Sequence, residues 1–236
     1  MSDVLVDLAV VSHRGGVRTA NEDSAGFGSW VLTALEGDVL AVRVPLVSPF
    51  DVIVADGLGG HRGGERASRA TVQSYLDSGL APVEAALAAN VAVHTLADAE
   101  PALAGMGSTL VAARLHPDGR VTIVNVGDSR AYRLVDGHLG LLSEDDRPTS
   151  GATTTVTQVI GGERRVAIEP HLFSTTLQPG GVLLLCSDGL HDYVDDDAIA
   201  TALAAVPEIA ARRLLDLALA AGAPDNVTIA VLAVTS

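Results

Sequence analysis

Aspartates recur where apolar runs break into turns, and these carboxylates are the side chains in the sequence best suited to chemistry. Four of them share one format: Asp56 in VADG, Asp128 in VGDS, Asp188 in CSDG and Asp225 in PDN. A fifth acidic site, Glu22 with Asp23, follows the first apolar run. Carboxylates at strand ends can converge on one rim of a sheet, where they repel one another and stay ionised together only if cations lie between them. All-oxygen ligand sets suit hard cations such as Mg²⁺ or Mn²⁺.

Any one of these aspartates also has an ordinary structural explanation, because Asp-Gly is a common turn pair and Asp often caps helices. Asp118-Gly119 and Asp136-Gly137 fit plain hairpin turns. The run Asp195–Asp197 fits the start of a helix, where negative charge is favourable. A metal site is therefore indicated only if the fold gathers the other carboxylates together.

The charge balance excludes several classes of function. The chain of 236 residues has 29 acidic and 15 basic residues, a net charge of −14, and every basic residue is arginine. Such an acidic surface is poorly suited to nucleic acid, so no nucleic-acid partner is expected. Without lysine the glycine-rich segment DGLGGHRGGE cannot be a P-loop, and Schiff-base chemistry is excluded. A site that handles phosphate groups on this chain needs bound cations.

The predicted elements favour an α+β fold with antiparallel layers in a single domain, residues 1–236. Strands are expected at Val4–Val11, Asp51–Ala55, Ser108–Leu115, Arg120–Val126, Ala131–Val135, Val182–Cys186 and Val227–Val234, with a hairpin made of Trp30–Leu35 and Asp38–Val44. Helices are expected from Gly63 to Gly79, from Pro82 to Pro101, after Asp195, and from Pro207 to Gly222. Because the helices come in two blocks and do not alternate with strands, a doubly wound parallel sheet is disfavoured.

The single cysteine bears on the reaction mechanism, and the N-terminal segment bears on the location of the protein in the cell. Cys186 is the one cysteine, and Asp192 stands six positions later, where a cysteine-dependent phosphatase needs arginine. Cys186 is therefore expected to be a small core residue. The N-terminal segment has no basic region before its apolar stretch, and no run of about 18 apolar residues exists, so a cytoplasmic protein without a membrane partner is expected. His191, close to Asp188 in sequence, is expected in a solvated loop.

Six segments, taken together and in order, resemble the metal-dependent serine/threonine protein phosphatases of type 2C, in their bacterial form. The segments are Arg18-Thr19-Ala20-Asn21-Glu22-Asp23-Ser24, Asp56-Gly57-Leu58-Gly59-Gly60-His61, Gly105-Met106-Gly107-Ser108-Thr109, Gly127-Asp128-Ser129-Arg130, Ser187-Asp188-Gly189-Leu190 and Asp225-Asn226-Val227-Thr228. The resemblance implies a four-layer α-β-β-α sandwich, in which helices flank two central antiparallel sheets. It also implies hydrolysis of phosphoserine and phosphothreonine by a water that bridges two metal ions.

The resemblance also assigns roles to individual residues. Asp56 would bridge two Mg²⁺ or Mn²⁺ ions and the Gly57 carbonyl would complete one coordination shell. Asp188 and Asp225 would be ligands of the second ion, and Glu22 and Asp23 would act through bound waters. Asp128, with Asp188, would lie at the position of a weaker third ion. Arg18 would bind the substrate phosphate. The planar fork of an arginine suits two phosphate oxygens.

Two departures from the family pattern leave alternatives open. Leu58 stands where many eukaryotic relatives have a histidine proposed as general acid, and His61 matches a histidine of bacterial relatives with either a local structural role or a catalytic one. The segment Glu144–Thr155 is short for the flap that borders the catalytic face, which implies altered specificity or recruitment by a partner.

Two functions therefore stay open on the sequence, besides a nucleotide-binding module that the missing lysine disfavours. The first is a monomeric phosphatase that acts on phosphoproteins, the targets of a cognate serine/threonine kinase. The second is a non-catalytic relative that binds a phosphoprotein as a regulator or adaptor.

Overall fold

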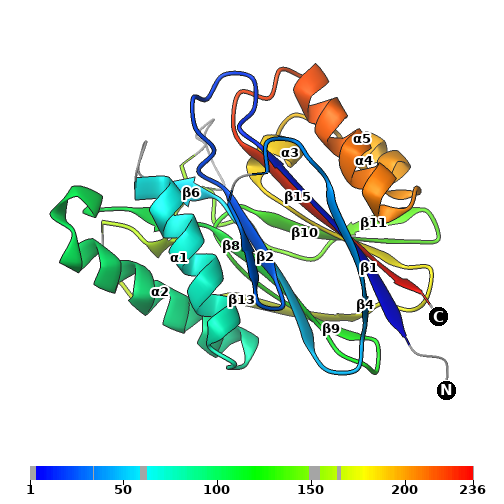
Figure 1. Ribbon diagram of the computed structural model, residues 1–236, viewed down its shortest axis with the longest axis horizontal. Helices are drawn as coiled ribbons and strands as arrows, with labels where there is room; N and C mark the ends of the chain where they lie inside the picture. Colours follow the sequence, from blue (N-terminus) through cyan, green and yellow to red (C-terminus); the bar gives the residue numbers. More distant parts are fainter. Residues whose placement is uncertain (1–3, 34, 59–62, 149–154, 164–165, 236) are drawn as a thin grey trace.

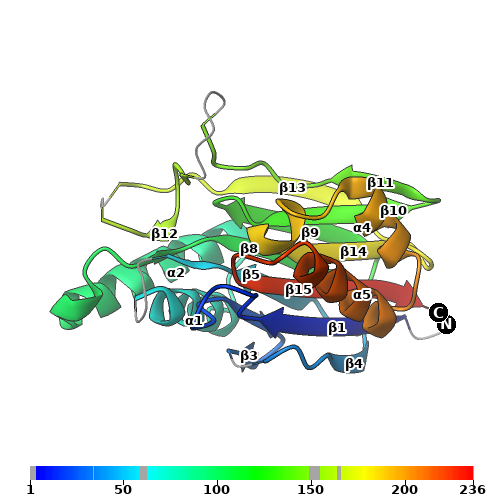
Figure 2. The same cartoon turned by 90° about the horizontal axis from the view of Figure 1, so that it is seen from above.

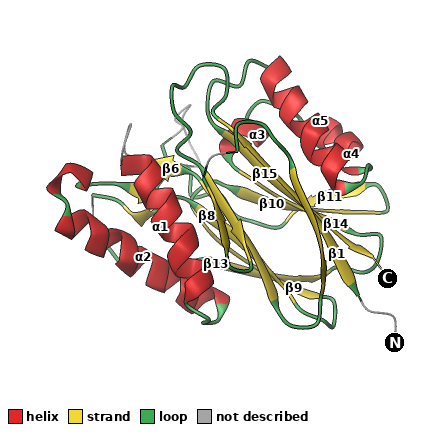
Figure 3. Cartoon of the chain, in the orientation of Figure 1, coloured by secondary structure: helices red, strands yellow, loops and turns green. Residues whose placement is uncertain are grey.

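Two six-stranded antiparallel sheets lie face to face in the computed structural model, and helices cover the outer face of each sheet (Figures 1 and 3). The structure describes residues 4–33, 35–58, 63–148, 155–163 and 166–235. The first sheet has the order β11-β10-β14-β15-β1-β4. Its strands are β1 (Leu5–His13), β4 (Leu40–Pro45), β10 (Arg130–Val135), β11 (His138–Leu141), β14 (Val182–Cys186) and β15 (Val227–Thr235).

The second sheet has the order β13-β9-β8-β5-β2-β3. Its strands are β2 (Ser24–Phe27), β3 (Trp30–Leu32), β5 (Phe50–Ala55), β8 (Leu110–Leu115), β9 (Arg120–Val126) and β13 (His171–Thr176). A small third sheet joins β6 (Gly57–Leu58), β7 (Gly107–Ser108) and β12 (Ile160–Gly161) beside it. This small sheet carries the Gly57 position, so it belongs to the scaffold of the candidate site.

The helices form the two outer layers. The second sheet is covered by α1 (Gly63–Asp77) and α2 (Pro82–Ala99), which a 3₁₀ turn (Pro101–Leu103) follows. The first sheet is covered by α4 (Asp196–Leu203) and α5 (Pro207–Ala220), and the short α3 (Asp188–His191) follows β14 (Figure 2). Proline in the first turn of α2 and α5 costs no hydrogen bond, since the first helical N–H groups lack partners anyway. The resulting α-β-β-α layering confirms the predicted fold class.

The continuous apolar runs of the strands follow from this layering, because both faces of the central strands are covered. In β1, Leu8 and Val10 point into the core between the sheets, whereas Ala9 and Val11 pack under the helices. The same alternation buries Leu185 between the sheets and Cys186 on the helix side. Each fully buried Leu or Val contributes about 1.5–3 kcal/mol through removal of apolar surface from water.

Most predicted elements are present, with small shifts at their ends. The hairpin expected around Glu36-Gly37 is wrong: β3 pairs with β2 in one sheet, whereas β4 pairs with β1 in the other. The single strand expected over Ser108–Leu115 is divided into β7 and β8. The sequence prediction missed β2, β13 and α3. These elements are short or irregular in pattern, and partners far away in the sequence stabilise them.

The paired register of β1 and β15 sets the positions of the chain ends. Leu5 lies opposite Thr235, so both described termini lie at the same end of the sandwich (Figures 1 and 2). Asp225 precedes β15 and therefore lies at the other end. None of the helices in the described ranges is long and apolar enough to cross a membrane.

Candidate active site

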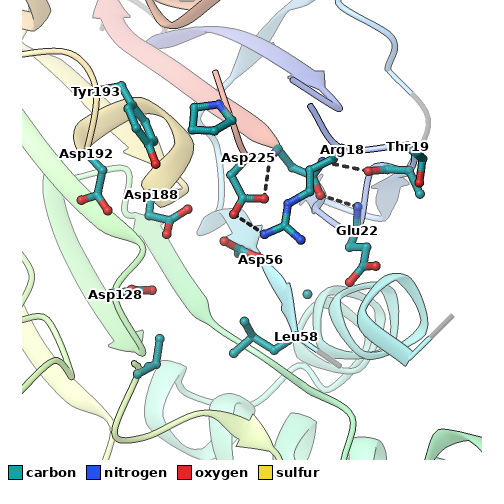
Figure 4. A pocket seen from close by; sticks show the side chains of 15 residues that line it. Arg18, Thr19, Glu22, Asp56, Leu58, Asp128, Asp188, Asp192, Tyr193 and Asp225 are labelled. Atoms are coloured by element: carbon teal, nitrogen blue, oxygen red, sulfur yellow. Dashed lines mark hydrogen bonds and ion pairs between the residues drawn. The ribbon is translucent and has the colours of Figure 1, made fainter. Parts of the chain in front are cut away.

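A pocket of about 440 Å³ opens at the end of the sandwich where strands of both sheets stop (Figure 4). Acidic side chains are the most frequent kind in its walls. The residues that line it are Arg18, Thr19, Ala20, Glu22, Asp56, Gly57, Leu58, Asp128, Val156, Asp188, Asp192, Tyr193, Pro224, Asp225 and Asn226. The fold therefore brings together carboxylates that are up to about 200 residues apart in the sequence, as predicted.

Asp56 follows β5 and is held mainly through its backbone. Its N–H donates to Thr109 Oγ1 at 2.9 Å, and its carbonyl accepts from the Thr109 N–H at 2.8 Å and from Ser108 Oγ at 2.9 Å. Thr109 Oγ1 lies 2.7 Å from Ser129 Oγ, beside Asp128. These contacts explain the Gly-Ser-Thr and Gly-Asp-Ser segments: they fix Asp56 and leave its carboxylate free to face the pocket.

Asp23 is buried under the pocket. Ser187 Oγ donates to Asp23 Oδ2 at 2.8 Å and accepts from the Thr228 N–H at 2.9 Å. Thr228 Oγ1 lies 2.7 Å from Ser12 Oγ, which accepts from Asn21 Nδ2 at 2.7 Å. This buried chain of hydroxyls ties together the loops that carry Asp23, Asp188 and Asp225.

Asn226 fastens the N-terminal loop to the Asp225 turn. Its Oδ1 accepts from the Glu22 N–H at 2.7 Å, and its Nδ2 donates to the carbonyls of Arg14 and Ala20, both at 2.9 Å. The Asn226 N–H in turn donates to Asp225 Oδ1 at 2.8 Å. The order of side chain types in Asp-Asn-Val-Thr is therefore explained by the contacts that each residue makes.

Close packing at Gly57 leaves no space for a side chain. A Cβ at this position would collide with the backbone oxygens of Gly64 and Glu22. A Cβ on Gly64, at the start of α1, would collide with the Glu22 carboxylate. Glycine at both positions lets the Asp56–Leu58 segment, the α1 N-terminus and the Glu22 loop approach closely, which a larger residue would prevent.

The carboxylates perturb one another strongly. Burial raises the pKa of Asp56 well above its ordinary value, and the charges of Asp23, Asp188, Asp225 and Asp128 raise this pKa further. Burial, followed by the charges of Asp128 and Asp225, raises the pKa of Asp188 to about 7. Burial raises the pKa of Asp23 to about 6. Such mutual effects show that the five aspartates share one poorly solvated space.

Two arginines form ion pairs with carboxylates of this pocket. Arg18 Nη2 pairs with Asp225 Oδ2 at 2.7 Å, and its side chain is 57% exposed. Arg147 pairs with Asp128, Asp188 and Asp192, and its side chain is 19% exposed. Arg18 itself lines the pocket and is largely exposed, whereas Arg147 is less exposed and pairs with three carboxylates that line it.

The donor set fits hard divalent cations. Asp188 Oδ1 and Asp23 Oδ1 are buried and have no hydrogen-bond partner in the structure. As the side chains stand, no three His, Cys, Asp or Glu residues of the described ranges are close enough to share one ion. Arg18 and Arg147 pair with four carboxylates of the site, Asp225 with the first and Asp128, Asp188 and Asp192 with the second. Oxygen atoms of Asp56, Asp188 and Asp225 around a poorly solvated centre are the ligands that Mg²⁺ or Mn²⁺ prefers.

The predicted site residues Arg18, Glu22, Asp56, Gly57, Asp128, Asp188 and Asp225 all line the pocket, and Asp23 lies below it. His61 lies outside the described residues, as does much of the short flap. The expectation of a solvated loop at His191 is wrong: its side chain is fully buried and its Nε2 lies 3.0 Å from the Asp128 carbonyl. α3 begins directly at Asp188, and its first turn carries His191 beneath the site.

Sequence reasoning missed Asp192 and Tyr193, which line the pocket, and Arg147, which pairs with three of its carboxylates. Arg147 lies in the least regular segment of the chain, where no periodic pattern guides prediction. Asp192 and Tyr193 follow the Ser-Asp-Gly-Leu segment closely, and this proximity was a usable signal. Tyr193 is 43% exposed at the pocket rim (Figure 4).

A two-sheet sandwich with acidic loops gathered at one end is the architecture of protein phosphatase 2C, and the chain belongs to this family. The family model described as Protein phosphatase 2C matches residues 38–221. The matched range contains Asp56, Asp128 and Asp188, while Arg18 and Asp225 lie outside it. The family assignment therefore agrees with the site but does not by itself cover all of it.

Individual relatives support the same assignment. The chain is 36% identical over 260 residues to the serine/threonine protein phosphatase PstP of Mycobacterium tuberculosis, an alignment that covers 97% of this chain and 45% of PstP. It is 31% identical over 215 residues to the serine/threonine phosphatase stp of Listeria innocua, with 78% of each protein covered.

A solved structure gives a comparison over the whole chain. The crystal structure of the PstP catalytic domain in complex with two manganese ions matches with a TM-score of 0.79 at 32% identity, and the match covers 99% of this chain and 100% of that domain. The chain thus spans less than half the length of PstP, but nearly all of it aligns with that catalytic domain.

Proposed function

We propose that this chain is a metal-dependent protein phosphatase that hydrolyses phosphoserine and phosphothreonine in proteins. The observation that carries the proposal is the placement of Asp56 at the centre of four other aspartates, in an open pocket with an exposed arginine at its mouth. An anionic phosphate group enters such a pocket only if cations offset the negative charge. The PstP catalytic domain, crystallised with two manganese ions, supports the same chemistry.

In this proposal Asp56, the Gly57 carbonyl, Asp188 and Asp225 hold two Mg²⁺ or Mn²⁺ ions. Glu22 and Asp23 contribute through water molecules. Divalent ions in such a site lower the pKa of water toward neutrality and offset charge that develops on a phosphoryl group.

Arg18 is the residue of this chain that orients the substrate. Its guanidinium lies beside Asp225, and a single carboxylate engages one of its nitrogens. The side chain is 57% exposed and lines the pocket, so its remaining N–H groups can donate hydrogen bonds to two phosphate oxygens. Arg18 therefore binds and aligns the phosphate next to Asp56.

The substrate class follows from the openness of the site. Phosphorylated side chains on a protein surface reach a pocket at the end of the sandwich, with Tyr193 and Val156 at the rim. As parts of the same proposal, the substrates are targets of a cognate serine/threonine kinase, residues 1–236 act as one catalytic domain, and the protein is a cytoplasmic monomer. The free, buried Cys186 fits a reducing compartment.

The test is hydrolysis of p-nitrophenyl phosphate and of a phosphothreonine peptide by chelator-treated protein, with and without added Mn²⁺. We expect turnover that requires Mn²⁺ and is lost in Asp56→Asn. The matched control is Asp118→Asn, which changes an exposed aspartate in a distant hairpin turn. Unchanged activity in Asp56→Asn would refute the central role of this residue. Absence of Mn²⁺-dependent turnover would refute the proposed phosphatase activity.

Absence of turnover would favour the second function that the sequence left open, a regulator that binds phosphoproteins. Leu58 at the pocket wall is compatible with either function, because water near the ions can supply the proton that the leaving group needs. Phosphopeptide binding measured by calorimetry, in protein without turnover, would distinguish this regulator from an unrelated protein.

A further inference from the structure

The guanidinium of Arg147 lies inside a cluster of three carboxylates. Its Nε donates to Asp128 Oδ2 at 2.6 Å, and its Nη1 and Nη2 each donate to one oxygen of Asp192 at 2.9 Å. The same Nη2 lies 3.3 Å from Asp188 Oδ2. Paired hydrogen bonds to one carboxylate fix the orientation of the guanidinium plane as well as its position.

Arg147 is unsuited to bind substrate phosphate. Each of its three guanidinium nitrogens already donates to a carboxylate. Its side chain is 19% exposed, against 57% for Arg18, which pairs with one carboxylate, Asp225, among the residues that the structure describes. Arg18 and Arg147 therefore have different tasks, and that of Arg147 concerns the carboxylates themselves.

The chain next to Arg147 is firmly anchored. Asp145 forms a paired ion contact with Arg130, with Nη2 to Oδ2 at 2.7 Å. Asp146 accepts from the Gly127 N–H at 2.8 Å and lies 3.0 Å from His171 Nε2. Because its two preceding residues are held in this way, the backbone of Arg147 has a fixed position from which its side chain reaches the Asp128 carboxylate.

The two carboxylate oxygens of Asp188 have different surroundings. Its Oδ2 faces Arg147, whereas its buried Oδ1 has no hydrogen-bond partner among the described residues. Asp128 Oδ2, on the Arg147 side, is already paired with a positive charge. The Asp188 oxygen that does not face Arg147 is therefore the one available to a cation, and Asp56 and Asp225 lie on the side of Asp188 opposite to Asp192 (Figure 4).

We propose that Arg147 is a built-in cation that takes the place of a third divalent ion between Asp128 and Asp188. The inference rests on the proposed function for the identity of the ions. The family resemblance implies a weaker third ion beside Asp128 and Asp188, and there this chain has a covalently attached positive charge. Two ions are then the full complement, and Arg147 is a positioning residue that holds Asp188 for one of them.

The experiment counts bound ions and does not need turnover. Chelator-treated protein is dialysed to equilibrium against Mn²⁺ at low millimolar concentration, and manganese per chain is measured by mass spectrometry. We expect two ions in the unmodified protein and in Arg147→Lys, which keeps the charge. We expect one additional ion in Arg147→Ala, because Asp128 and Asp188 then need a counter-charge. The control Arg66→Ala removes an arginine from a surface pair with Glu100 and should change nothing.

Three results would overturn the inference: a third ion in the unmodified protein, no additional ion in Arg147→Ala, or loss of an ion on Asp128→Asn in the unmodified background. The last variant decides the question even if Arg147→Ala does not fold, since Asp128 ligates no ion in this scheme. A failure of the proposed function looks different: no turnover with Mn²⁺ bound, whatever the number of ions.

Discussion

Arg18 and Asp225 lie 207 positions apart in the chain, yet their side chains form an ion pair of 2.7 Å at the mouth of the pocket. Asp225 raises the pKa of Arg18 through a hydrogen bond and its charge, so the guanidinium stays protonated. The pair joins the loop after β1 to the turn before β15, which are neighbouring antiparallel strands. The proposed phosphate-binding group and a candidate metal ligand are thereby placed side by side.

Arg18→Ala is expected to lower kcat/KM for a phosphothreonine peptide about 10- to 100-fold, because charge-assisted hydrogen bonds contribute about 1.5–3 kcal/mol. Steady-state kinetics with Mn²⁺ measures the effect. Arg14→Ala is the matched control, since Arg14 is exposed in the same loop and only its backbone carbonyl is used. Equal losses in both variants would contradict a specific role for Arg18.

Thr109→Val is expected to raise the Mn²⁺ concentration needed for half-maximal activity about 10- to 100-fold, the effect typical of residues that orient metal ligands. Valine keeps the shape but leaves the Asp56 N–H without its acceptor, which also costs about 1–3 kcal/mol of unfolding free energy. Activity against Mn²⁺ concentration and a thermal melt measure the two effects. Thr95→Val on the exposed face of α2 should change neither, and a normal Mn²⁺ dependence in Thr109→Val would exclude the orienting role.

Chelator-treated protein is expected to become less stable as pH rises from 5.5 to 8. The pKa of Asp188 is about 7 in the folded protein and about 4 in an unfolded chain, so the folded state binds the proton more tightly. The contribution of this group to stability is complete below about pH 4 and is lost as pH rises through 7. Thermal melts should fall by about 2–4 °C for each kcal/mol lost.

Mn²⁺ should reverse most of this loss at pH 8, because ions bind the ionised carboxylates of the folded state. Asp188→Asn, which cannot ionise, should show a smaller change with pH in the absence of metal. Chelated protein that is equally stable at both pH values would show that the carboxylates are better solvated than the structure indicates.

Cys186 is expected to be inert in the folded protein. Burial raises the pKa of its thiol far above the usual range, and the side chain packs under the helices in the outer core. A thiol reagent at pH 8 should label one cysteine only after unfolding, and Cys186→Ala should retain turnover. Rapid labelling of native protein, or loss of activity in Cys186→Ala beyond its loss of stability, would contradict a purely structural role.

Much of the fold was predictable because the apolar pattern of each segment agrees with the way that the segment is buried. Apolar strands such as β9 and β14 match their predicted bounds, and Pro82 and Pro207 mark helix starts as expected. The hairpin assigned to Trp30–Val44 failed because two adjacent apolar segments pair with different sheets. Only the partner strands decide that choice, and they lie elsewhere in the chain.

The sequence by itself determined the acidic character of the site, its expected hard-cation chemistry and the family resemblance, since these depend on residue types and their order. Only the tertiary structure decided which charges face which. Arg147 lies in an irregular segment, and nothing local indicates that its guanidinium reaches Asp128, Asp188 and Asp192. Those contacts arise because antiparallel pairing brings the ends of distant strands to one rim, where ion pairs form between residues that have no relationship along the chain.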